Sequence, residues 1–219
     1  MQKTVFFDLD GTVLDTLPDL VKSANYALAK LGYPKQSAET VRSAIGHGIR
    51  NLLRDLMNCK DEVELEKCRE IFKDYYDAHK ADATKPFDGI VDTLQMLKAD
   101  GYKLALISNK YDGATKDLAK SFFGDLFDAA YGSRDDILAK PNRDLFDLAC
   151  NENGLSGDGI IYVGDSEVDC EFAINCGMTL IAVDWGFRTR AQLVEAGAKS
   201  IVHSPSELFD KIKDLQTGE

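Results

Sequence analysis

Hydrophobic residues follow two different spacings along this chain. Near the N-terminus, the apolar residues 5–7 lead directly into Asp8 and Asp10, and Gly11 follows. A short apolar run that ends in such turn residues predicts a buried strand. In residues 16–84, apolar residues instead recur every three or four positions, which predicts amphipathic helices. The helices predicted in this segment lie at 17–31, 37–45, 49–56 and 61–79.

From residue 85 onward, strand and helix patterns alternate. The predicted strands are 102–107, 129–131, 160–163, 179–183 and 200–203, and the predicted helices are 90–99, 113–122, 144–153, 168–176 and 205–215. Such alternation favours a parallel sheet with helices on both faces. We therefore expect an α/β fold, a Rossmann-like doubly wound parallel sheet formed by residues 1–15 and 85–219. An all-helical domain, residues 16–84, is inserted after the first strand.

Composition narrows the classes of function. The formal net charge of −11 argues against nucleic-acid binding, because such proteins usually carry a basic surface. No apolar run reaches the roughly 18 residues of a membrane span, so no membrane partner is expected. The N-terminus lacks a secretory-leader pattern, which favours a cytoplasmic location. The five cysteines are scattered and fit reduced thiols better than a disulfide framework or a zinc site. The oligomeric state stays open.

Chemically active side chains follow several of the predicted strands. In an open parallel sheet the carboxyl ends of the strands share one edge, and active sites form there. The residues expected at this edge are Asp8, Asp10, Ser108, Asn109, Lys140, Asp165 and Asp169. A purely structural protein would not be expected to gather carboxylates, a hydroxyl and an amine in this way.

Asp8 and Asp10 form the most informative local pattern. Residues two apart on an extended strand point to the same side. Two carboxylates this close repel each other, and a pKa rises unless a cation lies between them. Mg²⁺ suits this position because it prefers oxygen ligands and needs only one or two protein carboxylates. By itself, the pattern also fits an ordinary polar turn at the end of a strand.

Four motifs in this order resemble those of the haloacid dehalogenase-like hydrolase superfamily, and the resemblance covers nearly the whole chain. They are Asp8-Leu9-Asp10-Gly11-Thr12, Ser108 at the end of a strand, Lys140 followed by proline, and Gly164-Asp165-Ser166-Glu167-Val168-Asp169. One Asp-x-Asp alone would be a weak signal. The helical segment lies where this superfamily carries its α-helical cap, and with Ser108-Asn109-Lys110 it looks most like phosphoglycolate-phosphatase-type members. Asn142-Arg143 departs from the pattern, since many relatives have a second proline there.

The resemblance implies a Mg²⁺-dependent phosphatase. Asp8 would be the nucleophile that forms an aspartyl-phosphate, and Asp10 would protonate the leaving oxygen and then activate water. The Asp8 side chain, the Asp10 main-chain carbonyl and Asp165 would hold the Mg²⁺. The remaining expectations are Ser108 and Lys140 in catalysis, Asp169 as an anchor of Lys140 or of metal-bound water, and Gly11, Thr12 and Asn109 in phosphate binding.

The cap would supply further contacts to the substrate. Gly48 and Arg50 are expected to bind it, because the break at residues 46–48 can project into the core site and Arg50 or His47 could then bind a second anionic group. A plain turn between helices with a solvated Arg50 is the alternative. Arg143 is a further candidate for an anion contact, and Lys110 is a rival cation to Lys140.

The expected substrate is a small phosphorylated metabolite, similar to phosphoglycolate. A phosphotransferase such as a sugar-phosphate mutase, or an inorganic pyrophosphatase, could use the same aspartyl-phosphate. A phosphonatase fits less well, since that resemblance would call for a small residue in place of Asp10. A non-catalytic binding protein is disfavoured because Asp8, Asp10 and Asp165 are all present.

Overall fold

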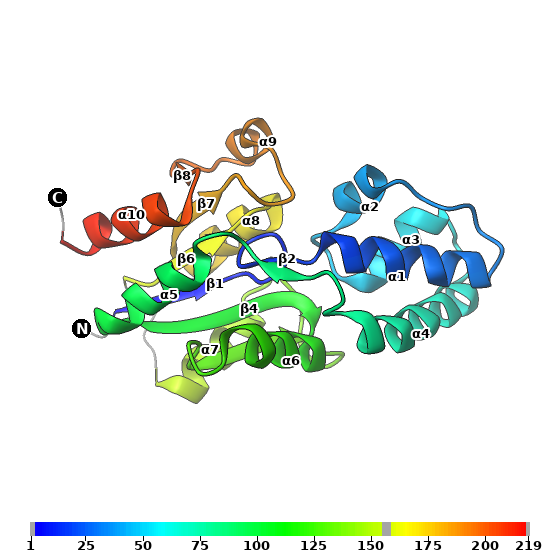
Figure 1. Cartoon of the computed structure of the whole chain (residues 1–219), viewed down its shortest axis with the longest axis horizontal. Helices are drawn as coiled ribbons and strands as arrows, with labels where there is room; N and C mark the ends of the chain where they lie inside the picture. Colours follow the sequence, from blue (N-terminus) through cyan, green and yellow to red (C-terminus); the bar gives the residue numbers. More distant parts are fainter. Residues whose placement is uncertain (1–2, 155–158, 218–219) are drawn as a thin grey trace.

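The computed structural model describes residues 3–154 and 159–217, and it has two parts (Figure 1). A parallel sheet with its helices forms the core, on the left of the view, and a group of helices forms the cap, on the right. The six-stranded sheet has the order β5-β4-β1-β6-β7-β8, and all its neighbours are parallel. Its strands are β1 (Thr4–Phe7), β4 (Lys103–Tyr111), β5 (Ala129–Ser133), β6 (Ile161–Gly164), β7 (Thr179–Val183) and β8 (Ile201–Val202). The predicted α/β fold is confirmed.

Helices cover both faces of the sheet because successive strand residues point to opposite sides. Val5 and Phe7 of β1 belong to one apolar cluster, and Phe6 between them belongs to another. The first cluster includes residues of α5 (Ile90–Ala99), α6 (Asp112–Phe123) and α10 (Pro205–Thr217). The second includes residues of α7 (Asp144–Asn153) and α8 (Glu167–Cys176). The short α9 (Arg190–Glu195) packs beside α8 and β7 through Leu193.

The cap has an apolar core of its own. It consists of α1 (Leu17–Lys30), α2 (Ala38–Ala44), α3 (Ile49–Met57) and α4 (Glu62–His79). Leu28, Leu53 and Phe72 are buried in its centre, and Ala114 of α6 joins the same cluster from the core. The apolar stripe of each cap helix therefore packs inward, and the cap rests on the core next to the end of β4.

The two chain segments that join cap and core run side by side. Leu14–Asp15 (β2) and Lys85–Pro86 (β3) form a short antiparallel pair. The buried carboxylate of Asp19 accepts hydrogen bonds from the Ala83 amide and from both the amide and the hydroxyl of Thr84. The domain boundaries expected at residues 15/16 and 84/85 lie at this pair of segments.

Most predicted elements agree with the structure to within one or two residues, apart from short ones and the end of β4. The hydrophobic pattern does not predict α9, β2 or β3, because such short pieces present too few residues to show a period. β4 continues beyond Ile107 to Tyr111, with a shift in its pairing to β5 between these two residues. Residues 108–110 therefore lie in an irregular part of the strand. Within the described residues, no helix is both long and apolar enough to cross a membrane.

Candidate active site

The loop after β1 places Asp8 beside Asp165. The Asp8 amide continues the sheet by donating to the Val163 carbonyl at 2.9 Å. Gly11 turns the chain with a φ of 82°, and a Cβ at this position would lie 2.3 Å from Asp165 Oδ2. Glycine is required here by both its backbone angle and the lack of space. Thr12 Oγ1 then donates to Asp165 Oδ1 at 3.0 Å, which holds this carboxylate next to the strand end.

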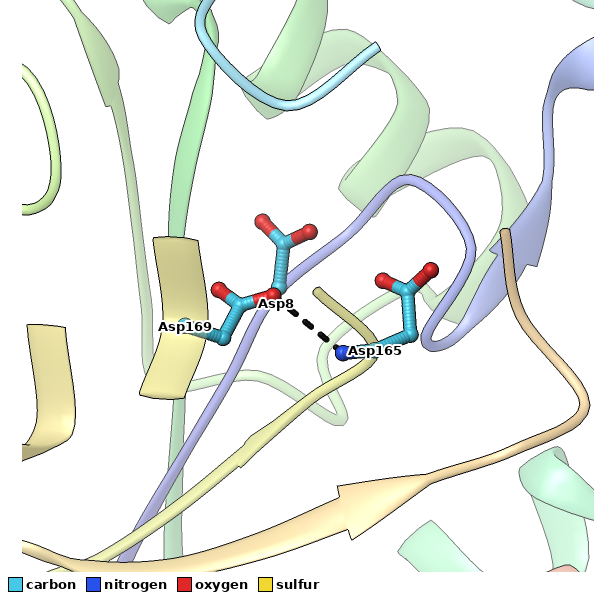
Figure 2. A group of neighbouring side chains, drawn as sticks. All are labelled: Asp8, Asp165 and Asp169. Carbon is cyan, nitrogen blue, oxygen red and sulfur yellow. Dashed lines mark hydrogen bonds between the residues drawn. The ribbon is translucent and has the colours of Figure 1, made fainter. Parts of the chain in front are cut away.

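Three carboxylates meet where β1 and β6 end (Figure 2). Asp8 follows β1, Asp165 follows β6, and Asp169 lies in the first turn of α8. All three are buried, and one oxygen from each lies within 4.8 Å of the others. Asp169 Oδ2 accepts hydrogen bonds from the Asp165 amide and from the amide and hydroxyl of Ser166. Asp169 is thus engaged by the residues that begin its helix and does not line the cavity between core and cap, whereas Asp8 and Asp165 do.

Lys140 places a positive charge within this group. Its Nζ lies 2.9 Å from Asp8 Oδ1, 2.8 Å from Asp169 Oδ1 and 2.7 Å from Tyr162 Oη. The Lys140 backbone is held by the Asn109 side chain, which accepts from the Lys140 amide and donates to the Lys140 carbonyl. The peptide bond that follows, Lys140–Pro141, is cis. Asn109 and Asp169 together therefore position the ammonium next to Asp8.

Negative charge exceeds positive charge around these carboxylates. Burial raises the pKa of Asp8 to about 6, with Lys140 opposing this and Asp169 and Asp10 adding to it. The pKa of Asp165 is raised well above its usual range by burial and by the charges of Asp169 and Asp8. A bound cation would compensate this excess. Buried carboxylate oxygens are a donor set that suits Mg²⁺, so the residues present fit this ion.

Asp10 has its own partners, which differ from those of Asp8. Its Oδ2 lies 3.0 Å from Lys110 Nζ, and its Oδ1 accepts from Thr16 Oγ1 at 2.6 Å. Lys140 and Lys110 therefore each pair with one of the two motif aspartates. This arrangement gives Asp8 and Asp10 different electrostatic surroundings although only one residue separates them.

A cavity that is partly open to solvent lies between core and cap. Its core side is polar and includes Asp8, Asp10, Ser108, Asn109, Lys140 and Asp165. Its cap side includes Gly48 and is otherwise mainly apolar, with Leu20, Leu52 and Phe72 among its residues. The cavity thus offers charged groups at the strand ends and an apolar wall opposite them.

Three residues expected to bind substrate or phosphate lie elsewhere. Arg50 is absent from the cavity lining, and its guanidinium pairs with Glu66 at 2.8 Å and Glu62 at 2.6 Å. The first turn of α3 directs Arg50 toward α4, where two acidic side chains stabilise it on the surface. Gly11 and Thr12 are also absent from the lining, and both contact Asp165 instead.

The two remaining cationic candidates also lie outside the cavity. His47 is exposed, and the exposed Arg143 pairs with Asp147 one helical turn along α7. Gly48 does line the cavity, close to the Asn109 carbonyl, which a Cβ on Gly48 would approach to 3.3 Å.

Several residues outside the four motifs hold the site residues in place. Tyr162 donates to Asp169 Oδ1 at 2.9 Å, and the Phe187 amide donates to Asp165 Oδ2 at 2.6 Å. Arg188 is buried, pairs with Glu167 at 2.6 Å and donates to three backbone carbonyls of the cap, among residues 42–45. The sequence offers one signal for Tyr162, a hydroxyl within an apolar strand. Arg188 gives none, because only the fold brings it to the cap.

Comparisons with known proteins agree with this geometry. A family model described as haloacid dehalogenase-like hydrolase matches residues 5–183. A phosphoglycolate phosphatase of Thiobacillus denitrificans is 31% identical over 213 residues, which cover 94% of this chain and 93% of that protein. A phosphoglycolate phosphatase of Chromobacterium violaceum is 32% identical, with 97% of each chain covered. The crystal structure of a Lactobacillus delbrueckii protein is 33% identical, has a TM-score of 0.89, and covers 97% of this chain and 99% of its own.

Proposed function

Because the chain belongs to the haloacid dehalogenase-like hydrolase family and is a phosphoric monoester hydrolase that acts on a phosphorylated small molecule, we propose that it works by Mg²⁺-dependent hydrolysis through an acyl phosphate on Asp8. The observation that carries the mechanism is the position of Asp8. It lines the cavity, with the Lys140 ammonium at 2.9 Å and the Asp165 carboxylate beside it. The relatives named phosphoglycolate phosphatase support a small phosphorylated carboxylic acid of this kind as the substrate.

In the first half-reaction, an oxygen of the Asp8 carboxylate attacks phosphorus, and the bond between phosphorus and the leaving oxygen breaks. Asp10 donates a proton to that leaving oxygen, so the product departs with a neutral hydroxyl group. Ser108 and the Asn109 amide are proposed to bind the phosphate oxygens. Lys140 carries the positive charge that reduces repulsion between the Asp8 carboxylate and the approaching anion.

In the second half-reaction, Asp10 accepts a proton from a water molecule that attacks the same phosphorus. The bond between phosphorus and Asp8 then breaks, which releases inorganic phosphate and restores the carboxylate. Asp169 and Tyr162 take no proton in this scheme, and they hold Lys140 in place. The Asp8 side chain, the Asp10 carbonyl and Asp165 are proposed to hold Mg²⁺, which supplies Lewis-acid stabilisation of phosphate charge when bound.

The decisive experiment is release of inorganic phosphate from p-nitrophenyl phosphate and a panel of phosphorylated metabolites in the presence of Mg²⁺. Asp8→Asn should lose at least about a thousandfold in kcat, because the amide is a poor nucleophile. Asp210→Asn, an exposed aspartate of α10, is the matched control and should retain activity. Full activity in Asp8→Asn, or in protein treated with EDTA, would refute the mechanism. The ratio of free phosphate to released alcohol also distinguishes hydrolysis from transfer of the phosphoryl group to another acceptor such as a sugar.

A further inference from the structure

The hydroxyl of Tyr76 is a buried polar group whose proton has no acceptor among the described residues, and the Lys110 ammonium is its cationic neighbour. Tyr76 lies in α4 of the cap, its side chain is fully buried, and it lines the same cavity as Asp8 and Asp10. A buried hydroxyl that makes no hydrogen bond destabilises the folded protein, and such groups usually have a partner. Where the group lines a ligand cavity, the ligand is a natural partner.

The Tyr76 hydroxyl is a donor at neutral pH. Burial raises the pKa of Tyr76 to about 12, with the nearby Lys110 opposing this shift. The ring itself is held in one position, since it stacks on Phe72 and meets Tyr111 edge-on. Tyr76 is therefore a fixed side chain with one proton available to an acceptor in the cavity.

Lys110 lies next to this hydroxyl. Its Nζ is over the Tyr76 ring, 4.6 Å from the centroid, and the side chain is buried and lines the same cavity. An ammonium has three N–H donors, and Asp10 at 3.0 Å accounts for one of them. Two hydrogen-bond donors, one of them cationic, thus lie together where α4 meets the end of β4.

Other cations near the cavity have their own partners. Lys140 contacts Asp8 and Asp169, and Arg188 contacts Glu167 and the carbonyls of the cap loop. Within the described part of the cap, the side chains that line the cavity include no charged residue. An anionic group of the substrate that reaches the cap side would therefore meet Lys110 and Tyr76.

We propose that Tyr76 and Lys110 form a subsite that binds a carboxylate on the leaving group of the substrate. The inference rests on the proposed function and names the part of the substrate that the cap selects. It also replaces Arg50, which the sequence suggested for this task. The substrate class is a short phosphate monoester with a carboxylate close to the ester oxygen. Leu20, Leu52 and Phe72 line the same cavity and belong to the same apolar cluster as Tyr76, and apolar surroundings strengthen a charged hydrogen bond.

Two substrates that differ at a single group test the subsite. 2-Phosphoglycolate carries the carboxylate, whereas ethyl phosphate has a methyl group in its place, and the ratio of their kcat/KM values measures the preference. Tyr76→Phe should lower this ratio by about tenfold or more, because a hydrogen bond to a charged group is lost. Tyr111→Phe is the matched control, since Tyr111 lines the same cavity but its hydroxyl already donates to Asp77. It should leave the ratio within about twofold.

Two further measurements separate binding from folding and from chemistry. Tyr76→Phe should unfold at the same temperature as the wild type or a higher one, because it removes an unsatisfied buried hydroxyl. If Tyr76 had only a structural role, Tyr76→Phe would instead lower the melting temperature and leave the ratio of the two kcat/KM values unchanged. In the Asp8→Asn background, where turnover stops, 2-phosphoglycolate should bind more tightly than ethyl phosphate, and Tyr76→Phe should remove most of that difference.

The proposal is overturned if Tyr76→Phe changes both substrates equally, or if the inactive protein binds the two phosphates with the same affinity. Failure of the proposed phosphatase mechanism has a different signature. In that case the Asp8→Asn protein keeps its activity, whatever the binding preference. Lys110→Met adds a second test. It should lower the ratio of the two kcat/KM values, and in the Asp8→Asn background it should weaken the binding of 2-phosphoglycolate.

Discussion

Arg188 Nη2 donates to the Ile45 carbonyl at 2.7 Å, and this hydrogen bond joins the core to the cap. The same guanidinium donates to the Arg42 and Ser43 carbonyls, and Glu167 holds it from the core side. The carbonyls belong to the end of α2 and the residue that follows it. The segment 45–48 between α2 and α3, which contributes to the cavity lining, is therefore anchored to the core just before Gly46.

Arg188→Ala is expected to loosen this loop. Hydrogen exchange of the amides of residues 43–48 should become at least about tenfold faster, because three charge-assisted hydrogen bonds are lost. KM should rise more than kcat falls, since the cap then encloses the substrate less often. Arg190→Ala, two residues away and exposed, is the control and should change neither quantity. Unchanged exchange in Arg188→Ala would contradict the anchoring role.

Thr12→Val should weaken metal binding without touching a ligand. Thr12 Oγ1 donates to Asp165 Oδ1 at 3.0 Å in a fully buried position, so valine removes a hydrogen bond that orients this carboxylate. The Mg²⁺ concentration that gives half-maximal activity should rise by roughly tenfold to hundredfold. Thr12→Ser keeps the hydroxyl and should restore most of the affinity. Equal Mg²⁺ dependence in Thr12→Val and the wild type would show that Asp165 needs no such support.

The stabilising effect of Mg²⁺ should depend on pH. Burial raises the pKa of Asp8 from 3.8 to about 6, so the folded metal-free protein binds this proton more tightly than the unfolded chain. Protonation of Asp8 therefore stabilises the folded protein below the unfolded pKa of this group, and the stabilisation is lost as the pH rises through the folded pKa of about 6. Mg²⁺ competes with that proton. The increase in the protein's melting temperature on adding Mg²⁺ should therefore be larger at pH 7.5 than at pH 5. Calorimetry at both pH values measures the difference.

Asp8→Asn provides the control for this pH effect, because the amide does not titrate in this range. The variant should show a smaller gain from Mg²⁺ and a weaker dependence of that gain on pH. A larger gain at pH 5 than at pH 7.5 in the wild type would mean that other groups bind the ion.

Arg50→Ala should have little effect on catalysis. The guanidinium pairs with Glu62 and Glu66 on the exposed surface of the cap, with 48% of the side chain exposed. Losing these surface pairs should cost less than about 1 kcal/mol of the free energy of unfolding. KM for 2-phosphoglycolate should stay within twofold, roughly, of the wild-type value. A large increase in KM, specific to carboxylate substrates, would place Arg50 in the substrate site after all.

The sequence was sufficient for the architecture and for the residues at the strand ends. Alternating strands and helices after residue 85, and a purely helical pattern before it, indicate a parallel sheet with an inserted cap. Strand geometry and the order of the motifs then bring Asp8, Lys140 and Asp165 to one edge. This works because the period of a strand and the shared edge of a parallel sheet are local and topological properties.

Only the tertiary structure decided which cations face the cavity. Lys110 follows the Ser108-Asn109 pair and Arg50 follows the break at residues 46–48, and the sequence by itself does not show which of the two faces the cavity. Packing of α3 against α4 turns Arg50 to Glu62 and Glu66, while the irregular end of β4 places Lys110 against Asp10 and Tyr76. The contact of Arg188 with the cap loop likewise joins residues more than 140 positions apart. Such pairings depend on how two separately packed domains meet, and that is set by long-range contacts rather than by local sequence.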